Sequence, residues 1–277
     1  MTILETQSAK ATLFRSQHHS GKLLVLPNIW DGLGAKLMEK VGYQSVATAS
    51  VATALSNGYL DGENIPFMQL LKTVNRIASA VSLPVTVDIE RGFSDSIILL
   101  KENIRLLIEN GGVGINIEDS HADGKGLFKI DEQCRKIEMI RETGIQCGVP
   151  IVINARTDIF LQKTKDNAMG QAIERGLAFK AAGADCFYPI VVNNYDEISR
   201  LVQEVGMPLN VLLSKQTGDL KHLEKIGVAR VSLGPNLLNH ALATMKQIAE
   251  GLLHYDTTAF FSHELLPREF LNSLARD

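Results

Sequence analysis

Short apolar runs alternate with longer segments of helical period along most of this chain. The apolar runs, rich in Val and Ile, predict strands at residues 23–28, 45–50, 84–90, 113–119, 150–158, 185–192, 208–213 and 230–233. Apolar positions three or four residues apart predict helices at residues 31–41, 67–81, 94–110, 131–147, 167–182, 195–205, 219–226 and 237–253. A strand–helix unit is therefore expected to repeat about eight times.

This repeat predicts an α/β fold, a (β/α)₈ TIM-type barrel. Nearly continuous apolar strands between helices are typical of a parallel sheet that is buried on both faces, and repeated crossovers of one hand close such a sheet. An open doubly wound sheet is the rival, but no GxGxxG motif follows the first strand. We expect a single barrel domain over residues 1–277, with residues 257–277 as a C-terminal helical extension that caps the barrel bottom or packs on another subunit.

Composition narrows the class of protein further. The 277 residues are 45% hydrophobic and 21% charged, which suits one domain with an ample core, and the net charge of −3 offers no basic footprint for nucleic acid. The three cysteines form no CxxC motif, so we expect neither disulfides nor a zinc site. No signal-peptide pattern and no run of about 18 apolar residues is present. A cytoplasmic protein without nucleic-acid or membrane partners is the expectation.

Acidic residues gather at the predicted carboxyl ends of neighbouring strands, where barrel enzymes carry their chemistry. Asp88 and Glu90 end the third strand on one side of it, Glu118 ends the fourth, and Asp61 lies in the loop after the second. Such a concentration of carboxylates repels itself and requires a cation. Oxygen ligands with retained waters favour Mg²⁺, with Mn²⁺ as the alternative ion.

Arg156, at the end of the fifth strand, is expected across the same mouth. A guanidinium binds a carboxylate or phosphonate through two hydrogen bonds, so metal and arginine together predict a site for a small, doubly anionic substrate. The metal would polarise a 2-oxo group and stabilise an enolate. Simpler roles are also open: ion pairs inside the barrel for Asp88 and Glu90, a structural pair between Glu118 and Arg156, and a turn role for Asp61. Helix caps are expected at Asp31 and Asp158.

Five segments resemble the isocitrate lyase/phosphoenolpyruvate mutase superfamily, and are most similar to its phosphonomutase-like branch. They read PNIWDGLGAKLMEKVGY, ATASVATALSNGYLDGE, LPVTVDIERGF, GGVGINIEDS and INARTDIFL. The resemblance runs from about residue 24 to residue 234, and the ordered series VDIE, GINIED, NARTD is its specific part. It implies an enzyme, a carbon–carbon lyase before other classes.

The resemblance also implies roles for individual residues. Asp88 would bind Mg²⁺ directly, while Glu90, Glu118 and Asp61 would hold its waters, with Asp61, Glu118 and Arg156 forming the catalytic set. Backbone amides around Ser50, Val51 and Ala52 would bind the substrate carboxylate and oxo oxygen, and Arg156 its anionic groups. A homotetramer is implied as well, built from dimers that exchange their last barrel helices.

Two departures from the family pattern narrow the reaction. Lyases of the family carry a Cys in a gating loop after the fourth strand, whereas residues 120–128 here read SHADGKGLF. Phosphonate mutases carry an Asn in that loop and a His after the sixth strand, where this chain has Tyr188-Pro189. Cleavage of isocitrate or 2-methylisocitrate and mutase activity are both disfavoured. In the loop, His121, Asp123 or Lys125 could assist a hydrolytic reaction.

The expected function is therefore a Mg²⁺-dependent cleavage of a C–C or C–P bond in a small 2-oxo acid or substituted malate through an enolate. Decarboxylation of the oxaloacetate type suits the altered loop, because loss of CO₂ needs no base to begin. The alternatives are a phosphoenolpyruvate/phosphonopyruvate mutase, a barrel that binds a phosphorylated substrate near Gly234-Pro235-Asn236, and a non-catalytic ligand-binding barrel.

Overall fold

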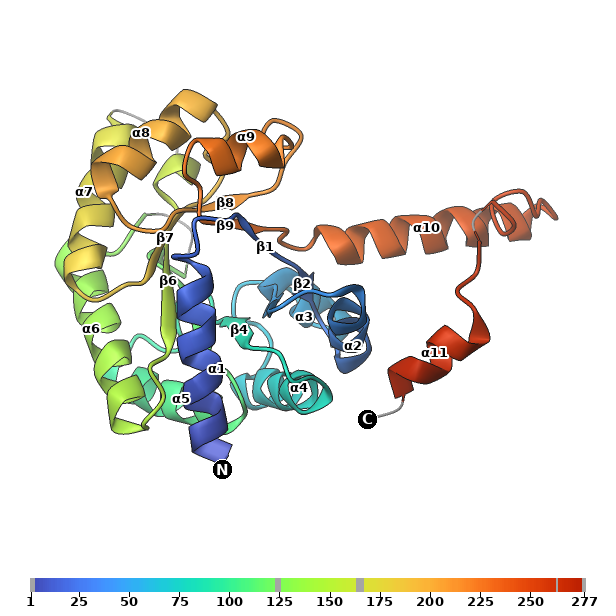
Figure 1. Ribbon diagram of the computed structural model, residues 1–277, viewed down its shortest axis with the longest axis horizontal. Helices are drawn as coiled ribbons and strands as arrows, with labels where there is room; N and C mark the ends of the chain where they lie inside the picture. The colour runs from blue at the N-terminus through green and yellow to red at the C-terminus, as the bar shows by residue number, and fades with distance from the viewer. Residues whose placement is uncertain (1–2, 123–125, 163–166, 263, 276–277) are drawn as a thin grey trace.

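Parallel strands form a closed barrel at the centre of the molecule, as the sequence predicted (Figure 1). The structure is a computed structural model and describes residues 3–122, 126–162, 167–262 and 264–275. The strands are β1 (Leu24–Leu26), β2 (Asn28–Ile29), β3 (Val46–Thr48), β4 (Val85–Asp88), β5 (Gly114–Glu118), β6 (Val152–Thr157), β7 (Cys186–Pro189), β8 (Asn210–Leu212) and β9 (Arg230–Ser232).

The order of pairing explains how the barrel closes. Strands β2 to β7 pair in sequence order, and β8 pairs with β9, which pairs with β1. A single bridge between Phe187 and Leu209 joins β7 to β8. Pro27 has no N–H group for a ladder bond and separates β1 from β2. These two short strands together take the place of the first strand, so the barrel has eight strand positions.

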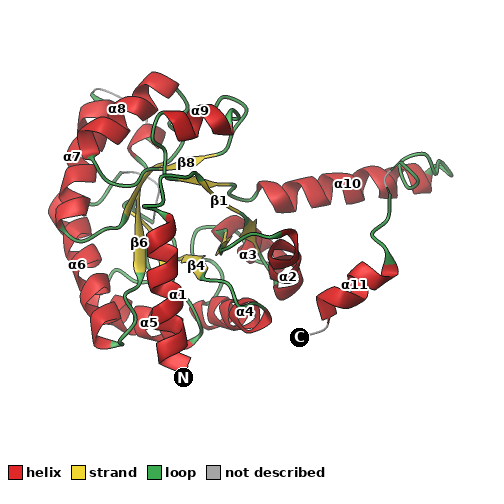
Figure 2. Ribbon diagram, viewed as in Figure 1, coloured by secondary structure: helices red, strands yellow, loops and turns green. Residues whose placement is uncertain are grey.

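Helices cover the strands, most of them as an outer layer around the barrel (Figure 2). They are α1 (Ile3–Gln17), α2 (Gly32–Val41), α3 (Ser50–Ser56), α4 (Phe67–Ala80), α5 (Ile97–Glu109), α6 (Ile130–Gln146), the 3₁₀ turn η1 (Ile159–Leu161), α7 (Ala168–Ala181), α8 (Tyr195–Val205), α9 (Leu220–Lys225), α10 (Asn236–Leu253) and α11 (Arg268–Ala275). Asp31 caps α2 as expected, because its Oδ1 accepts from the Gly34 amide at 2.6 Å.

The sequence pattern did not predict α1, which closes the bottom of the barrel. The fully buried ring of Phe14 packs there with Leu26, Ala47 and Val152. Arg15 fixes the helix by donating to Asp185 at 2.8 Å and to backbone carbonyls at the start of β6. The barrel bottom is therefore occupied by the N-terminal helix.

The helix predicted over residues 237–253 is present as α10, and both C-terminal helices lie outside the barrel wall. Helix α10 projects away from the body (Figure 1), and Leu238 is its only buried residue within the described chain. Helix α11 returns to contact α2, so the tail neither caps the barrel bottom nor remains detached. No helix in the described chain is long and apolar enough to cross a membrane.

Candidate active site

Asp88 ends β4 at the barrel mouth and is held in place by three neighbours. Its amide donates to Thr48 Oγ1 at 3.0 Å, and its carboxylate accepts from the amides of Ser50 and Glu90, each at 3.3 Å. Burial raises the pKa of this carboxyl group, Arg156 opposes that shift, and the charge of Asp61 adds to it. Asp88 is thus a fixed, poorly solvated carboxyl group whose ionised form would be stabilised by a nearby cation.

Glu90 is buried beside Asp88, and its backbone adopts the left-handed conformation with φ of 49°. Its Oε1 accepts from the Glu63 amide at 2.9 Å. Burial raises the pKa of Glu90 to about 8; this hydrogen bond lowers it, whereas the charges of Asp88, Asp61 and Glu118 raise it further. A non-glycine residue in this conformation is strained and is typical of functional sites.

Glu118 and Arg156 are partners across neighbouring strands. Arg156 Nη1 lies 2.8 Å from Glu118 Oε2, and its Nε and Nη2 donate to Asp158 at 2.6 and 2.9 Å. Burial raises the pKa of Glu118 to about 7 against the opposing effect of Arg156. The expected capping role of Asp158 is wrong: its side chain makes no cap hydrogen bond and instead orients the guanidinium.

The remaining predicted residues stand at the rim of this cluster. Asp61 is exposed, but its charge raises the pKa of both Asp88 and Glu90. Residues 50–52 form the first turn of α3, and amides in a first helical turn lack acceptors within the helix. The predicted site residues therefore gather at one end of the barrel, with Asp61 the least constrained.

The donor set fits a hard cation held mainly through water. Several poorly solvated carboxyl groups raise one another's pKa, and a cation would relieve that cost. In the described ranges, no three His, Cys, Asp or Glu side chains stand close enough together to hold a metal ion directly. One direct carboxylate with waters on the other groups is the coordination that Mg²⁺ favours.

Affinity for Mg²⁺ is expected to rise steeply between pH 6 and pH 9. Glu90 and Glu118, with pKa values of about 8 and about 7, must lose protons when the cation binds. Their pKa values exceed the usual 4.5, so the unfolded chain ionises first and the metal-free protein loses stability as pH rises from about 5 to about 8. Titration calorimetry and the unfolding temperature, with and without Mg²⁺, measure both effects.

Glu90→Gln is the matched control for this pH dependence, because it removes the carboxyl group with a pKa of about 8 in an isosteric way. Its Mg²⁺ affinity should vary less with pH than that of the wild type. A wild-type affinity that is constant from pH 6 to pH 9 would contradict the assigned pKa values.

Sequence reasoning missed the supports of this cluster. Glu63 Oε1 accepts from the amides of Arg91 at 3.0 Å and Phe93 at 2.8 Å, and its Oε2 pairs with Arg91 Nη2 at 2.7 Å. Asp119 is fully buried, pairs with Arg175 at 3.0 Å and accepts from the Asp158 amide. The acidic sequence EDS alone does not distinguish Glu118, which pairs with Arg156 at the barrel mouth, from this structural aspartate.

The sequence also singled out the turn at Gly234 and the loop after β5, and neither is part of the carboxylate cluster. The amides of Leu233 and Gly234 both donate to Asn28 Oδ1, so this turn is engaged within the chain and the idea of a phosphate site there is weakened. His121 packs edge-on against Phe128 at a centroid distance of 4.4 Å. Asp123 and Lys125 lie outside the described residues.

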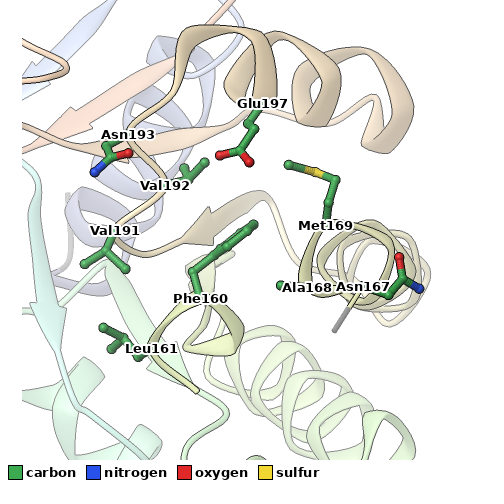
Figure 3. A pocket seen from close by; sticks show the side chains of 9 residues that line it. All are labelled: Phe160, Leu161, Asn167, Ala168, Met169, Val191, Val192, Asn193 and Glu197. Carbon is green, nitrogen blue, oxygen red and sulfur yellow. The ribbon is translucent and has the colours of Figure 1, made fainter. Parts of the chain in front are cut away.

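A separate cavity of about 730 Å³ lies on the rim beside β7 (Figure 3). Phe160, Met169 and Glu197 extend toward it from η1, α7 and α8. None of the clustered carboxylates lines it, and its one carboxylate, Glu197, is exposed. The cavity therefore lacks both the carboxylate cluster and the arginine of the barrel mouth.

Comparison with known proteins identifies the class to which this barrel and its mouth belong. The family profile described as phosphoenolpyruvate phosphomutase matches residues 14–253. The chain belongs to this family, and hence to the isocitrate lyase/phosphoenolpyruvate mutase superfamily of enzymes. The resemblance drawn from the sequence motifs is confirmed.

Individual relatives agree with this membership. An uncharacterized protein of Mycobacterium tuberculosis is 31% identical over 80% of this chain and 81% of its own length. The 2,3-dimethylmalate lyase of Eubacterium barkeri is 27% identical over 86% and 84%. A solved structure of a candidate lyase/mutase from Burkholderia cenocepacia J2315 has a TM-score of 0.89 and 31% identity, over 99% of this chain and 98% of that one.

A fourth comparison concerns the metal. The solved structure of phosphonopyruvate hydrolase in complex with oxalate and Mg²⁺ has a TM-score of 0.82, over 96% of this chain and 94% of that one. At 22% identity, this likeness establishes the shared fold alone. In that structure, phosphonopyruvate hydrolase holds Mg²⁺ together with oxalate.

Proposed function

We propose that this chain is a Mg²⁺-dependent lyase-type enzyme that cleaves a carbon–carbon bond in a small 2-oxo acid or substituted malate through an enolate. The observation that carries the proposal is the carboxylate cluster of Asp88, Glu90 and Glu118 facing an arginine that Asp158 fixes in orientation. Such a site combines a place for a cation with a place for an anion.

The acidic residues have two kinds of task in this proposal. Asp88 binds the ion directly, while Glu90, Glu118 and Asp61 hold its waters; Mn²⁺ is the alternative ion. The bound ion supplies Lewis-acid polarisation of the 2-oxo oxygen. The preference for Mg²⁺ follows from the oxygen-only donors and has support from the named complex of phosphonopyruvate hydrolase.

The substrate is held from two sides. The amides of Val51 and Ala52 receive its carboxylate and oxo oxygen, because first-turn N–H groups favour anions, while the neighbouring Ser50 amide donates to Asp88. Arg156 donates to its second anionic group. Three of its N–H donors are already engaged by Glu118 and Asp158, which fixes the plane of the guanidinium and leaves its remaining donors for the substrate.

The altered loop favours decarboxylation of the oxaloacetate type. Residues 120–128 lack the Cys on which the family's lyases rely, and departure of CO₂ needs no base to begin. Carbon–carbon cleavage has support from the named activity of the Eubacterium barkeri relative. A phosphoenolpyruvate/phosphonopyruvate mutase is the second candidate, favoured by the family profile, and a non-catalytic binding barrel is the third.

A substrate panel tests the proposal. Purified protein is incubated with oxaloacetate, phosphonopyruvate, 2,3-dimethylmalate and 2-methylisocitrate, with Mg²⁺ or with EDTA, and 2-oxo products are detected by NMR. We expect Mg²⁺-dependent pyruvate from oxaloacetate above the metal-only rate. Isomerisation of phosphonopyruvate without cleavage would favour the mutase. If no compound is turned over and no product protons exchange with solvent, the result would favour the non-catalytic binding barrel.

We also propose that the protein is a homotetramer in the cytoplasm, made of dimers that exchange α10. Several apolar side chains of α10 are exposed, among them Leu242, Met245 and Leu253. An apolar groove of about 370 Å³ lies between α2, α10 and α11, lined by residues such as Trp30 and Leu237. A partner's helix in this groove would cover both surfaces.

The assembly has a direct test in light scattering. The wild type is expected at four times the chain mass of 30.4 kDa. Leu242→Asp should lower this mass, whereas Leu177→Asp, at a similarly exposed leucine on α7, should leave it unchanged. A monomeric wild type at working concentration would refute helix exchange.

A further inference from the structure

The proposed reaction lacks an acid that returns a proton to carbon. An enolate leaves as a 2-oxo acid only after its carbon is protonated. Asp88 serves the cation, and the pKa of Arg156 is raised by its carboxylate neighbours, so that the guanidinium keeps its protons. His121 packs against Phe128. The described part of the loop therefore presents no evident donor.

Tyr188 lies inside the barrel at the level of the active site. Asn116 points inward, because Arg230 donates to it at 3.2 Å from β9, on the opposite side of the ring. Glu118, two residues later on β5, shares this inner face. In the ladder, Glu118 is opposite Arg156 and Arg156 is opposite Tyr188, so all three side chains face the same interior.

The surroundings of Tyr188 are those of the reaction centre. The residue is only 4% exposed. The charges it experiences come from Arg156, Asp88, Arg230 and Asp158, all of which belong to the mouth or to the layer beneath it. Burial is the main cause of a raised pKa for this phenol, which keeps its proton at neutral pH.

The hydroxyl of Tyr188 is available for a reaction partner. A buried tyrosine normally uses its hydroxyl in a hydrogen bond. Among the described residues, however, this hydroxyl neither donates to nor accepts from any group, unlike that of Tyr195, which accepts from the Asp219 amide at 3.3 Å. It is also not among the fully sealed polar atoms of the described core that lack partners, so the hydroxyl oxygen keeps some access to solvent.

We propose that Tyr188 is the proton donor to the enolate carbon, a role that rests on the proposed function. The O–H bond of Tyr188 breaks as the new C–H bond forms from the electron pair of the enolate C=C bond. The enolate oxygen then regains its C=O bond. The phenolate takes a proton from water in the mouth, and the neighbouring guanidinium of Arg156 stabilises its transient negative charge.

Stereochemistry distinguishes a positioned acid from a structural tyrosine. Decarboxylation of 3-methyloxaloacetate in D₂O places one deuterium on C3 of 2-oxobutyrate, and immediate reduction to 2-hydroxybutyrate preserves the label for NMR. The wild type should yield one configuration at C3. Tyr188→Phe should yield both in equal amounts, with kcat lower by about 10²-fold and KM nearly unchanged, because solvent then protonates the enolate.

Control variants make each outcome decisive. Tyr195→Phe should retain the wild-type configuration and rate, and the unfolding temperature of Tyr188→Phe should match the wild type. Wild-type stereochemistry and rate in Tyr188→Phe, or their loss in His121→Gln instead, would overturn the assignment of Tyr188 alone. A wild type that neither turns over any substrate nor exchanges the methyl protons of pyruvate with D₂O would overturn the proposed function together with this assignment.

Discussion

Replacement of Asp88 with alanine is expected to abolish Mg²⁺-dependent turnover, with a loss of about 10³-fold or more in kcat. The reason is that Asp88 is the one proposed direct ligand, and Lewis-acid stabilisation contributes several kcal/mol, each 1.4 kcal/mol of which is about tenfold in rate. The fold should persist. Because burial and Asp61 raise the pKa of this carboxyl group, its removal relieves an unfavourable charge in the metal-free protein.

Two measurements separate metal loss from general damage. Titration calorimetry should show no Mg²⁺ binding to Asp88→Ala, and thermal unfolding without metal should occur at or above the wild-type temperature. Asp95→Ala is the matched control, because this exposed aspartate lies in the loop that follows β4. Full activity in Asp88→Ala would remove the metal hypothesis.

Arg156→Lys is expected to raise KM for a doubly anionic substrate by roughly 10- to 100-fold, with a smaller effect on kcat. In the native site, two nitrogens of Arg156 contact Asp158 while a third contacts Glu118. A lysine ammonium is a point charge and makes only part of this set, so the substrate loses a hydrogen bond to a charged group, about 1.5–3 kcal/mol.

Steady-state kinetics with a dianionic and a monoanionic substrate analogue measure this effect. The increase in KM should be larger for the dianion. Arg200→Lys is the control, since that exposed arginine pairs with Glu204 on α8, away from the mouth. If KM and kcat of Arg156→Lys equal those of the wild type, the role of Arg156 is structural.

The barrel and the gathering of its acidic residues were predictable because both follow from local pattern. The repeated strand–helix unit placed Asp88, Glu118 and Arg156 at the same end. The predicted third strand was too long, however: β4 ends at Asp88, and Glu90 reaches the cluster from the left-handed turn beyond it. Helix α1 escaped prediction because its apolar positions do not form a clear helical stripe, although one of them, Phe14, closes the barrel bottom.

Long-range partners account for the remaining differences. The residue type of Asp158 suited a helix cap, but its carboxylate accepts from Arg156, and only the folded chain decides between a helix amide and a guanidinium as the donor. Helix α10 has the apolar period of a barrel helix, yet it lies away from the barrel in a single chain. The role that we propose for Tyr188 depends on strand register, which the sequence does not specify.

The hydrogen bonds of Glu63 link the loop before α4 with Glu90, one of the groups that we propose to hold the waters of the cation. Glu63 binds the segment after β4 through Arg91 and Phe93, while its own amide holds Glu90. Movement of Glu63 away from the barrel therefore requires these bonds to break. If the Glu63 amide moved away, the pKa of Glu90 would rise, because this hydrogen bond lowers it. Movement of the Glu63 loop would then be accompanied by proton uptake and by weaker binding of the proposed ion. Exchange of substrate, proton and metal would then be one coupled event.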